Sequence, residues 1–264
     1  MTFMVASGVM DLSAGSIVSL CGVLTALALH AGMGIAESCL ICIAAGGLMG
    51  GLNGVLIHCT GINFFVLTLA SSGMLRGVSL MITDGKPVTK FGKEFMQLGI
   101  GRIGELQLPV LFALALILIS FPLLFHTKLG NYIQALGGSE TALKRAGVRT
   151  GFYRIFVHVF LGITAAVTAI IITARLNSAE PNAGMNMEFD AVTAVIMGGT
   201  PIRGGTASIT GTVLAVLILG IIRNGLTLLS VSSDFQQWIT GFLLLASVLI
   251  SEIKVWKFRT LIKS

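Results

Sequence analysis

Long runs of apolar residues constrain this chain more than any other feature of its sequence. They recur along its 264 residues, and a run of about 18 to 20 residues is long enough for a helix to cross the hydrocarbon core of a bilayer. Charged residues make up only 11% of the chain, against about 25% in soluble domains. Too little polar surface is present to cover such a chain in water. The sequence therefore predicts an all-α fold, a polytopic bundle of transmembrane helices.

We expect about eight to nine membrane segments in a single transmembrane domain that covers residues 1–264. The apolar runs lie at residues 15–31, 36–57, 64–82, 108–125, 155–173, 187–200, 207–228 and 235–252. The run at 187–200 is marginal in length. It must count as a crossing because two basic regions, described next, need an even number of crossings between them.

Two basic regions set the expected orientation. Residues 126–154 contain five Lys or Arg and one acid, and residues 254–263 contain four Lys or Arg and no acid. Short loops rich in Lys and Arg face the cytoplasm. Both regions are therefore expected inside, and the polar segment 84–107 is expected to be a periplasmic loop. The net charge of +6 has the same origin, and no basic and aromatic residues alternate on a polar face as nucleic-acid binding requires.

The sequence contains no convincing motif for catalysis, metal binding or nucleotide binding. Cys39 and Cys42 form a CxxC, but it lies within an apolar run and has neither a second Cys pair nor nearby histidines, so we expect these residues to pack rather than bind metal. The four histidines lie on different segments without a catalytic set. A GxxxxGK[ST] phosphate loop is absent from the sequence. We expect no catalytic residue, metal or cofactor in this chain.

Glycine is abundant, and part of it follows a helical spacing. Gly46, Gly50 and Gly54 lie four residues apart, with Gly47 and Gly51 beside them. Small residues at this spacing allow the backbones of two membrane helices to approach closely. We expect this stripe to be a site of helix packing.

Residues 135–147, with the sequence ALGGSETALKRAG, form a small polar and basic island. Two glycines are expected to break the chain after an amphipathic piece at 132–136, Ser139 to cap a helix that begins at Glu140, and Gly147 to end it. A helix this short is not stable alone in water. It therefore needs a partner surface, unless the segment is an ordinary basic loop.

Three further parts of the sequence could either line a path for a solute through the membrane or have a purely structural role. Pro181 and Gly184 prevent a regular helix in residues 177–190, where irregular backbone near the membrane is tolerated only in protein or beside water. Asp190 could instead cap the run that follows it. Asp11 is expected to cap a helix that begins near Ser13. The aromatic faces of Phe64 and Phe65 could stack on a sugar, or these side chains could face lipid or pack in the core. The candidate path residues are Phe64, Phe65, Asn177, Asn182, Glu188 and Asp190.

Several stretches, taken in order, resemble the ribose-type permeases, the membrane subunits of bacterial ATP-binding-cassette (ABC) sugar importers. They cover nearly the whole chain, and the ordered set is specific although no single stretch is. Two features depart from the pattern: Arg203 interrupts a glycine-rich stretch, and about the first one and a half spans are missing, so we expect one to two helices to be absent upstream. The stretches are GVMDLSAGS (8–16), GLNG (51–54), FVLTLA (65–70), RG (76–77), TDGKP (83–87), ALGGSE (135–140), ARLNSAEPNAG (174–184), EFDA (188–191), GGT (198–200) and NGLTLL (224–229).

The resemblance implies a permease subunit for a ribose-like monosaccharide or a related small polar solute, in the bacterial inner membrane. It implies separate ABC ATPase subunits that bind ATP and Mg²⁺, a second permease subunit, and a periplasmic or lipid-anchored substrate-binding protein. It also makes the island the coupling element that docks in the ATPase. The residues implied in coupling are Gly137, Gly138, Ser139, Glu140, Ala142, Arg145 and Gly147.

One alternative from another class stays open. A self-contained secondary transporter or channel would need its own site for a coupling ion, and the sequence has no clear repeat and no cluster of intramembrane acids. The solute, and the choice between homodimer and heterodimer, also stay open.

Overall fold

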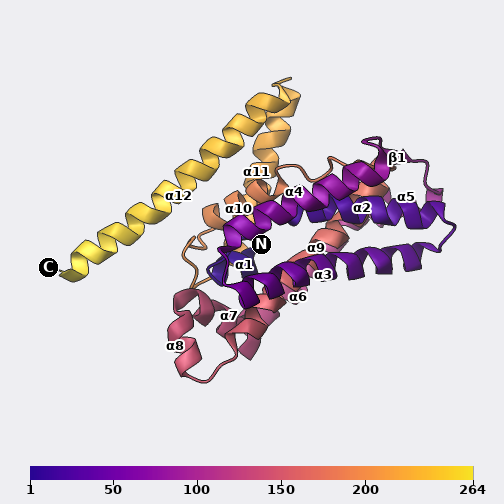
Figure 1. The fold of residues 1–264 in the computed structure, drawn as a ribbon. Helices are drawn as coiled ribbons and strands as arrows, with labels where there is room; N and C mark the ends of the chain where they lie inside the picture. The colour runs from indigo at the N-terminus through magenta and orange to yellow at the C-terminus, as the bar shows by residue number, and fades with distance from the viewer. Residues whose placement is uncertain (264) are drawn as a thin grey trace. The chain divides into compact units, whose positions relative to one another are not determined.

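The computed structural model describes the backbone of residues 1–263 and the side chains of residues 1–251. It is mostly helical, with short two-residue strands (Figure 1). The chain divides into two compact units. The larger unit contains Asp11–Thr127 and Arg149–Glu188, and the smaller unit contains Met1–Met10, Lys128–Val148 and Phe189–Ser264.

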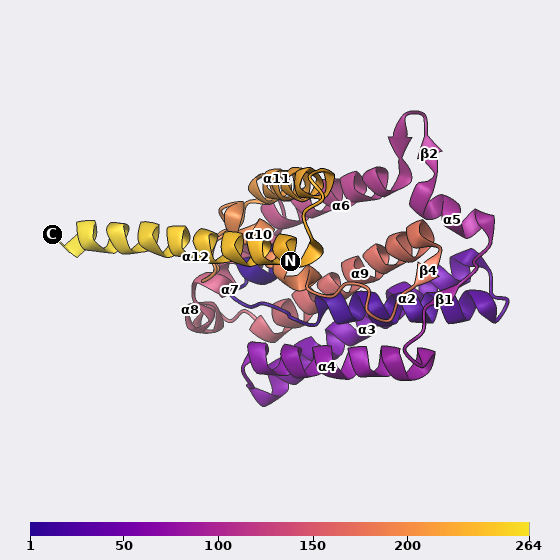
Figure 2. The ribbon, with the colours of Figure 1, turned by 90° about the horizontal axis from the view of Figure 1, so that it is seen from above.

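Four long helices form the centre of the larger unit. They are α2 (Ala14–His30), α3 (Ile35–Thr60), α4 (Phe64–Thr83) and α9 (Thr150–Leu176). Figures 1 and 2 show α3 beside α9, with α2 against both. A fifth long helix, α6 (Leu108–Phe125), begins with a proline in its first turn, where the missing N–H costs nothing.

The glycine stripe lies at the contact between α3 and α9. A Cβ atom on Gly46 would be 2.5 Å from the carbonyl oxygen of Gly162, and one on Gly50 would be 2.2 Å from that of His158. On Gly54 it would be 2.9 Å from the Cα of Ile155. These separations leave no room for a side chain, so the predicted role of the stripe in helix packing is confirmed.

The polar segment 84–107 is more structured than a loop. It contains β1 (Val88–Thr89), α5 (Lys93–Ile100), β2 (Arg102–Ile103) and β3 (Leu106–Gln107). β2 and β3 form an antiparallel hairpin. β1 pairs in antiparallel fashion with β4 (Ser178–Ala179), with Val88 opposite Ala179. The end of α9 therefore lies on the same side of the larger unit as the start of this segment.

The smaller unit contains the remaining helices. These are α1 (Thr2–Ala6), α7 (Lys128–Gly138), α8 (Glu140–Arg145), α10 (Met187–Met197, which belongs to this unit from Phe189 on), α11 (Ile209–Leu228) and α12 (Ser233–Lys263). The side chains of the basic tail, Lys254, Lys257, Arg259 and Lys263, lie outside the described residues.

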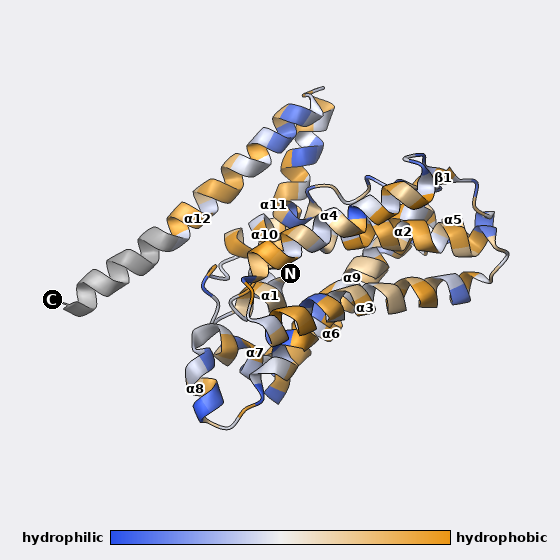
Figure 3. Ribbon diagram, in the orientation of Figure 1, coloured by the Kyte–Doolittle hydropathy of each residue, from blue (hydrophilic) through white to orange (hydrophobic). Residues whose placement is uncertain are grey.

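In the described part of the chain, six helices are long and apolar enough to cross a membrane: α3, α4, α6, α9, α11 and the part of α12 up to Ser251. α2 is also apolar but has 17 residues. Figure 3 shows the long helices as mainly hydrophobic, whereas the short helix α8, which is not among them, contains hydrophilic residues. The helical membrane bundle is thus confirmed, while a count of eight to nine segments depends on α2 and α10.

Candidate functional site

α8 is a short, capped helix. The side-chain oxygen of Ser139 accepts the backbone N–H of Ala142 at 3.3 Å, and the Glu140 carboxylate pairs with Lys144 at 2.9 Å. Gly147, with a φ of +78°, follows the helix, and its N–H donates to the Lys144 carbonyl. The predicted start, cap and end of this helix are confirmed.

The sequence predicted that Gly137 and Gly138 break the chain before α8, and this position is wrong. α7 is not limited to 132–136 but continues through both glycines, Gly137 and Gly138. Neither has a positive φ, so the turn is made at Ser139, whose backbone is extended. Gly137 is needed for another reason, because a Cβ atom there would be 2.1 Å from the Ala6 carbonyl oxygen and 2.5 Å from the Gly205 nitrogen.

The residues implied in coupling form a mostly exposed surface. Leu143 is buried and attaches α8 to the smaller unit. Glu140 is partly buried, as is Gly137. The exposed members are Gly138, Ser139, Ala142, Arg145 and Gly147. This surface is small and basic, and α8 is fixed by its cap at Ser139 and by the burial of Leu143.

Phe64 and Phe65 open α4. The Asn63 side chain caps this helix by accepting the Phe65 N–H at 2.9 Å. Phe65 is 51% exposed, while Phe64 is half-buried. In the described part of the chain, no hydrogen bond or ring contact joins either side chain to the irregular segment 177–186, so a role in the path stays a prediction.

The segment 177–186 is irregular and packs inside the larger unit. Asn177 has a φ of +50°, and its side-chain oxygen accepts the Phe91 N–H at 3.1 Å. The carbonyl oxygen of Pro181 accepts hydrogen bonds from Ser19 on α2 and from Arg76 on α4, the latter at 3.4 Å. Sequence reasoning missed these two donors, because they are distant in the chain. Irregular backbone enclosed in protein in this way is compatible with membrane depth.

The end of this segment touches the first turns of α2. A Cβ atom on Gly15 would be 2.1 Å from the Gly184 carbonyl oxygen and 2.3 Å from the Glu188 carboxylate. Glu188 therefore lies at the amino-terminal end of α2, where the helix dipole favours a negative charge. Asn182 is exposed. Both remain candidates for the path.

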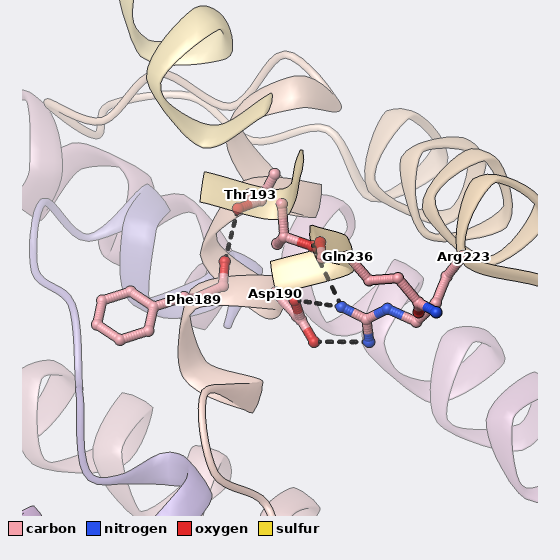
Figure 4. A network of polar contacts seen from close by, with 6 residues as sticks. Phe189, Asp190, Thr193, Arg223 and Gln236 are labelled. Carbon is pink, nitrogen blue, oxygen red and sulfur yellow. Dashed lines mark hydrogen bonds and ion pairs between the residues drawn. The ribbon is translucent and has the colours of Figure 1, made fainter. Parts of the chain in front are cut away.

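Asp190 does not cap the run that follows it. It lies within α10, and its two carboxylate oxygens accept hydrogen bonds from Arg223 on α11 at 3.0 and 2.8 Å (Figure 4). The capping interpretation is therefore wrong. Arg223 was missed in the sequence because a lone arginine near a helix end gives no sign of its partner. Asp190 belongs to the smaller unit, whereas the other path candidates belong to the larger unit.

Asp11 belongs to a buried polar cluster that precedes α2. One carboxylate oxygen accepts both the backbone N–H and the hydroxyl of Ser13, which is the N-cap residue. Asn53 on α3 donates to the Ser13 hydroxyl oxygen at 2.9 Å. Asp11 thus fixes the turn at the predicted helix start by binding Ser13. His158 is buried nearby and interacts electrostatically with Asp11.

Among residues 1–251, no group of three or more His, Cys, Asp or Glu side chains is placed to hold a metal ion. Exposed apolar helices, enclosed irregular backbone and one short basic helix define a membrane transport subunit. The fold and the site therefore indicate a permease.

Comparison with known proteins identifies which permease family this is. The chain belongs to the family described as branched-chain amino acid transport system / permease component, whose model matches residues 1–248. The predicted relationship to ABC importer permeases is confirmed. The chain is a multi-pass inner-membrane protein, and its relatives are transport subunits rather than enzymes.

Three relatives from Escherichia coli K12 show the extent of the similarity. The ribose import permease RbsC is 37% identical over 262 residues, which cover 96% of this chain and 80% of RbsC. The D-allose permease AlsC is 34% identical, covering 92% of this chain and 75% of AlsC. The L-arabinose permease AraH is 34% identical, covering 98% of this chain and 79% of AraH. No solved structure matches the chain.

Proposed function

We propose that this chain forms the translocation path for a ribose-like monosaccharide in an ATP-driven importer. The observation that carries the proposal is the similarity to RbsC over nearly the whole chain, together with relatives whose names specify allose and arabinose. Each of the three named solutes is a small neutral sugar. A pore that discriminates among such solutes needs hydrogen-bonding groups and shape rather than charge.

The proposed partners follow from the family and from α8. Two ATPase subunits bind ATP and Mg²⁺ and receive the α8 surface, while this chain binds neither. A second permease subunit completes the path, and a substrate-binding protein delivers the sugar from outside. ATP-driven closure of the ATPases moves α8, and the motion reaches α1 and the turn at Gly205 because both pack directly on α7 at Gly137.

The proposed topology places residues 126–154 in the cytoplasm and 84–107 in the periplasm. The pairing of β1 with β4 supports it, because α9 starts within the last residues of the basic region and ends beside the polar segment. The six long helices together with α2 and α10 make eight membrane segments. The 11 residues of α10 rise only about 16 Å, so this segment crosses with the help of irregular backbone.

The proposed path includes the six residues predicted from the sequence. Phe64 and Phe65 offer aromatic faces, Asn177, Asn182 and Glu188 belong to the irregular segment and the start of α10, and Asp190 offers a carboxylate. The hydrogen bonds that hold the Pro181 carbonyl to α2 and α4 support the assignment of the segment 177–186 to the path rather than to an external loop.

Reconstitution tests the proposal. The chain is co-expressed with an ABC ATPase and a sugar-binding protein from the same genome, purified, and placed in liposomes with radiolabelled D-ribose, D-allose or L-arabinose. Uptake that requires ATP and the binding protein is the expected result. Uptake of these sugars driven by an ion gradient without ATP, or the absence of any co-purified ATPase, would contradict the proposal and favour a secondary transporter.

A further inference from the structure

A polar network connects three helices of the smaller unit. Arg223 on α11 donates two hydrogen bonds to Asp190 on α10 and one, at 3.3 Å, to the Thr240 hydroxyl on α12. Gln236 on α12 donates to the Thr227 hydroxyl at 3.3 Å. We call Asp190, Arg223, Thr227, Gln236 and Thr240 the Arg223 network, and Figure 4 shows its centre.

The network is accessible, although it is built on apolar helices. The Arg223 and Asp190 side chains are 51% and 31% exposed, and α11 is among the helices apolar enough to span a membrane. Ionised side chains in membrane segments face a water-filled cavity or the interior of a bundle, because contact with lipid tails is costly. This side of α10, α11 and α12 therefore faces water or protein rather than lipid.

The residues of the network lie at the amino-terminal ends of α10 and α12 and at the carboxyl-terminal end of α11, and all three ends are on the same side of the membrane in the proposed topology. Asp190 is in the first turn of α10, Gln236 and Thr240 are in the first two turns of α12, and Arg223 is five residues before the end of α11. Five residues correspond to about 8 Å of helix rise. In the proposed topology these ends are periplasmic, so the network lies near the outer surface of the membrane.

The chemistry of the network suits a neutral ligand with several hydroxyls. The opposite charges of Asp190 and Arg223 cancel, which gives an anion or a cation no net attraction. A guanidinium has five N–H donors and a carboxylate has about four lone-pair sites, and the bidentate pair uses only part of each. Donors and acceptors thus lie side by side, matching the adjacent hydroxyls of a sugar, each of which both donates and accepts.

We propose that the Arg223 network is a binding site for a neutral polyhydroxylated solute at the outer mouth of the path. The proposal rests on the proposed function, and names Arg223 and Thr240 as ligand-binding residues beside Asp190. The competing interpretation is a salt bridge that only holds three helices together.

A charge exchange separates the two interpretations. The double variant Asp190→Arg, Arg223→Asp keeps a salt bridge between α10 and α11 but reverses the positions of donors and acceptors. The complete transporter in liposomes is assayed for D-ribose uptake and for ATP hydrolysis stimulated by the binding protein. We expect assembly and ATP hydrolysis to persist, and the sugar moved per ATP hydrolysed to fall by about tenfold, the factor that corresponds to about 1.4 kcal/mol if affinity for the sugar falls equally. Wild-type uptake per ATP in the double variant would overturn the proposal.

A conservative change provides a second test that does not depend on the salt bridge. Thr240→Val removes one hydroxyl that contacts Arg223, and we expect it to lower sugar uptake per ATP while Asp190 and Arg223 remain paired. Thr193→Val is the matched control, because the Thr193 hydroxyl is buried and donates only to the Phe189 carbonyl within α10. Equal effects of the two variants would contradict a binding role for Thr240.

Accessibility tests the location without reference to transport. In a background lacking the partly exposed Cys39 and Cys59, Thr240→Cys should react with a charged, membrane-impermeant thiol reagent added outside, and D-ribose should slow the reaction. Phe242→Cys is the control at similar depth, because Phe242 lies on the opposite side of α12 and is expected to face lipid. An unreactive Thr240→Cys would overturn the location. If wild-type protein takes up none of the three sugars, the proposed function and the sugar assignment both fail, whereas a reactive cysteine without sugar protection refutes the site alone.

Discussion

Gly137 on α7 lies so close to α1 that a Cβ atom added to it would be 2.1 Å from the carbonyl oxygen of Ala6. The same carbonyl accepts the backbone N–H of Gly205 at 2.9 Å. Three segments distant in sequence thus meet at one point without intervening side chains. Because α8 follows α7 directly, this junction determines where the exposed basic helix is held.

The junction predicts different consequences for two adjacent glycines. Gly137→Ala should destabilise the protein by about 1–3 kcal/mol, because the new methyl group meets backbone atoms that cannot move independently. Gly138→Ala should be neutral or slightly stabilising, because nothing lies within 4 Å of a Cβ there and its φ is not positive. Thermal unfolding of the two variants in detergent measures the difference. Equal stability of the two would show that α7 and α1 are not packed as described.

The orientation predicts which polar segments react from outside the cell. Ser139→Cys should resist a membrane-impermeant thiol reagent in intact cells, and Lys93→Cys should react, because the first lies in the basic region and the second in the polar segment 84–107. Both side chains are exposed, so burial does not explain a difference. Permeabilised cells, in which both should react, provide the control. Reaction of Ser139→Cys alone in intact cells would reverse the topology.

The cluster before α2 predicts a cost for removing one hydroxyl. Ser13→Ala leaves the Asn53 amide without its acceptor and takes one donor from the Asp11 carboxylate, all in a buried place. An unsatisfied buried polar group costs about 1–3 kcal/mol, so the variant should unfold at a clearly lower temperature. Ser232→Ala is the comparison, since Ser232 is exposed and its hydroxyl has a long hydrogen bond of 3.4 Å to Phe235. A Ser13→Ala variant as stable as Ser232→Ala would refute the role of the cluster.

The features that the sequence predicted correctly each depend on a few residues close together in the chain. The cap of α8 needs only Ser139 and the three residues after it, and the spacing of Gly46, Gly50 and Gly54 is a property of one helix. Asp190 was misinterpreted as a cap because an acid before an apolar run has that meaning locally. The structure starts α10 at Met187, four residues before Ala191, and two residues with positive φ, Gly184 and Asn186, precede it.

What the sequence did not predict depends on the rotation and approach of distant segments. Asp190 and Arg223 are 33 residues apart, and neither residue type identifies the other. The hydrogen bonds from Ser19 and Arg76 to Pro181 join segments more than 100 residues apart. In lipid, the apolar pattern gives weak information on rotation because apolar side chains are stable on every face of a helix.

The exposed surface of α8 leads to the last prediction, which concerns coupling. Ala142 is exposed while the neighbouring Leu143 is buried, so a large charged side chain at Ala142 changes the outer surface without disturbing the core. Ala142→Glu should abolish ATP hydrolysis stimulated by the binding protein if α8 docks in the ATPase, because the added carboxylate would be buried against the partner. Asn131→Glu, on the exposed side of α7 and outside the island, serves as the control and should retain most of the stimulation. A solvated loop instead predicts changes within about 0.5 kcal/mol for both variants, as for other surface substitutions. Normal stimulation in Ala142→Glu, with the permease inserted and the ATPase still co-purifying, would exclude α8 as the coupling element.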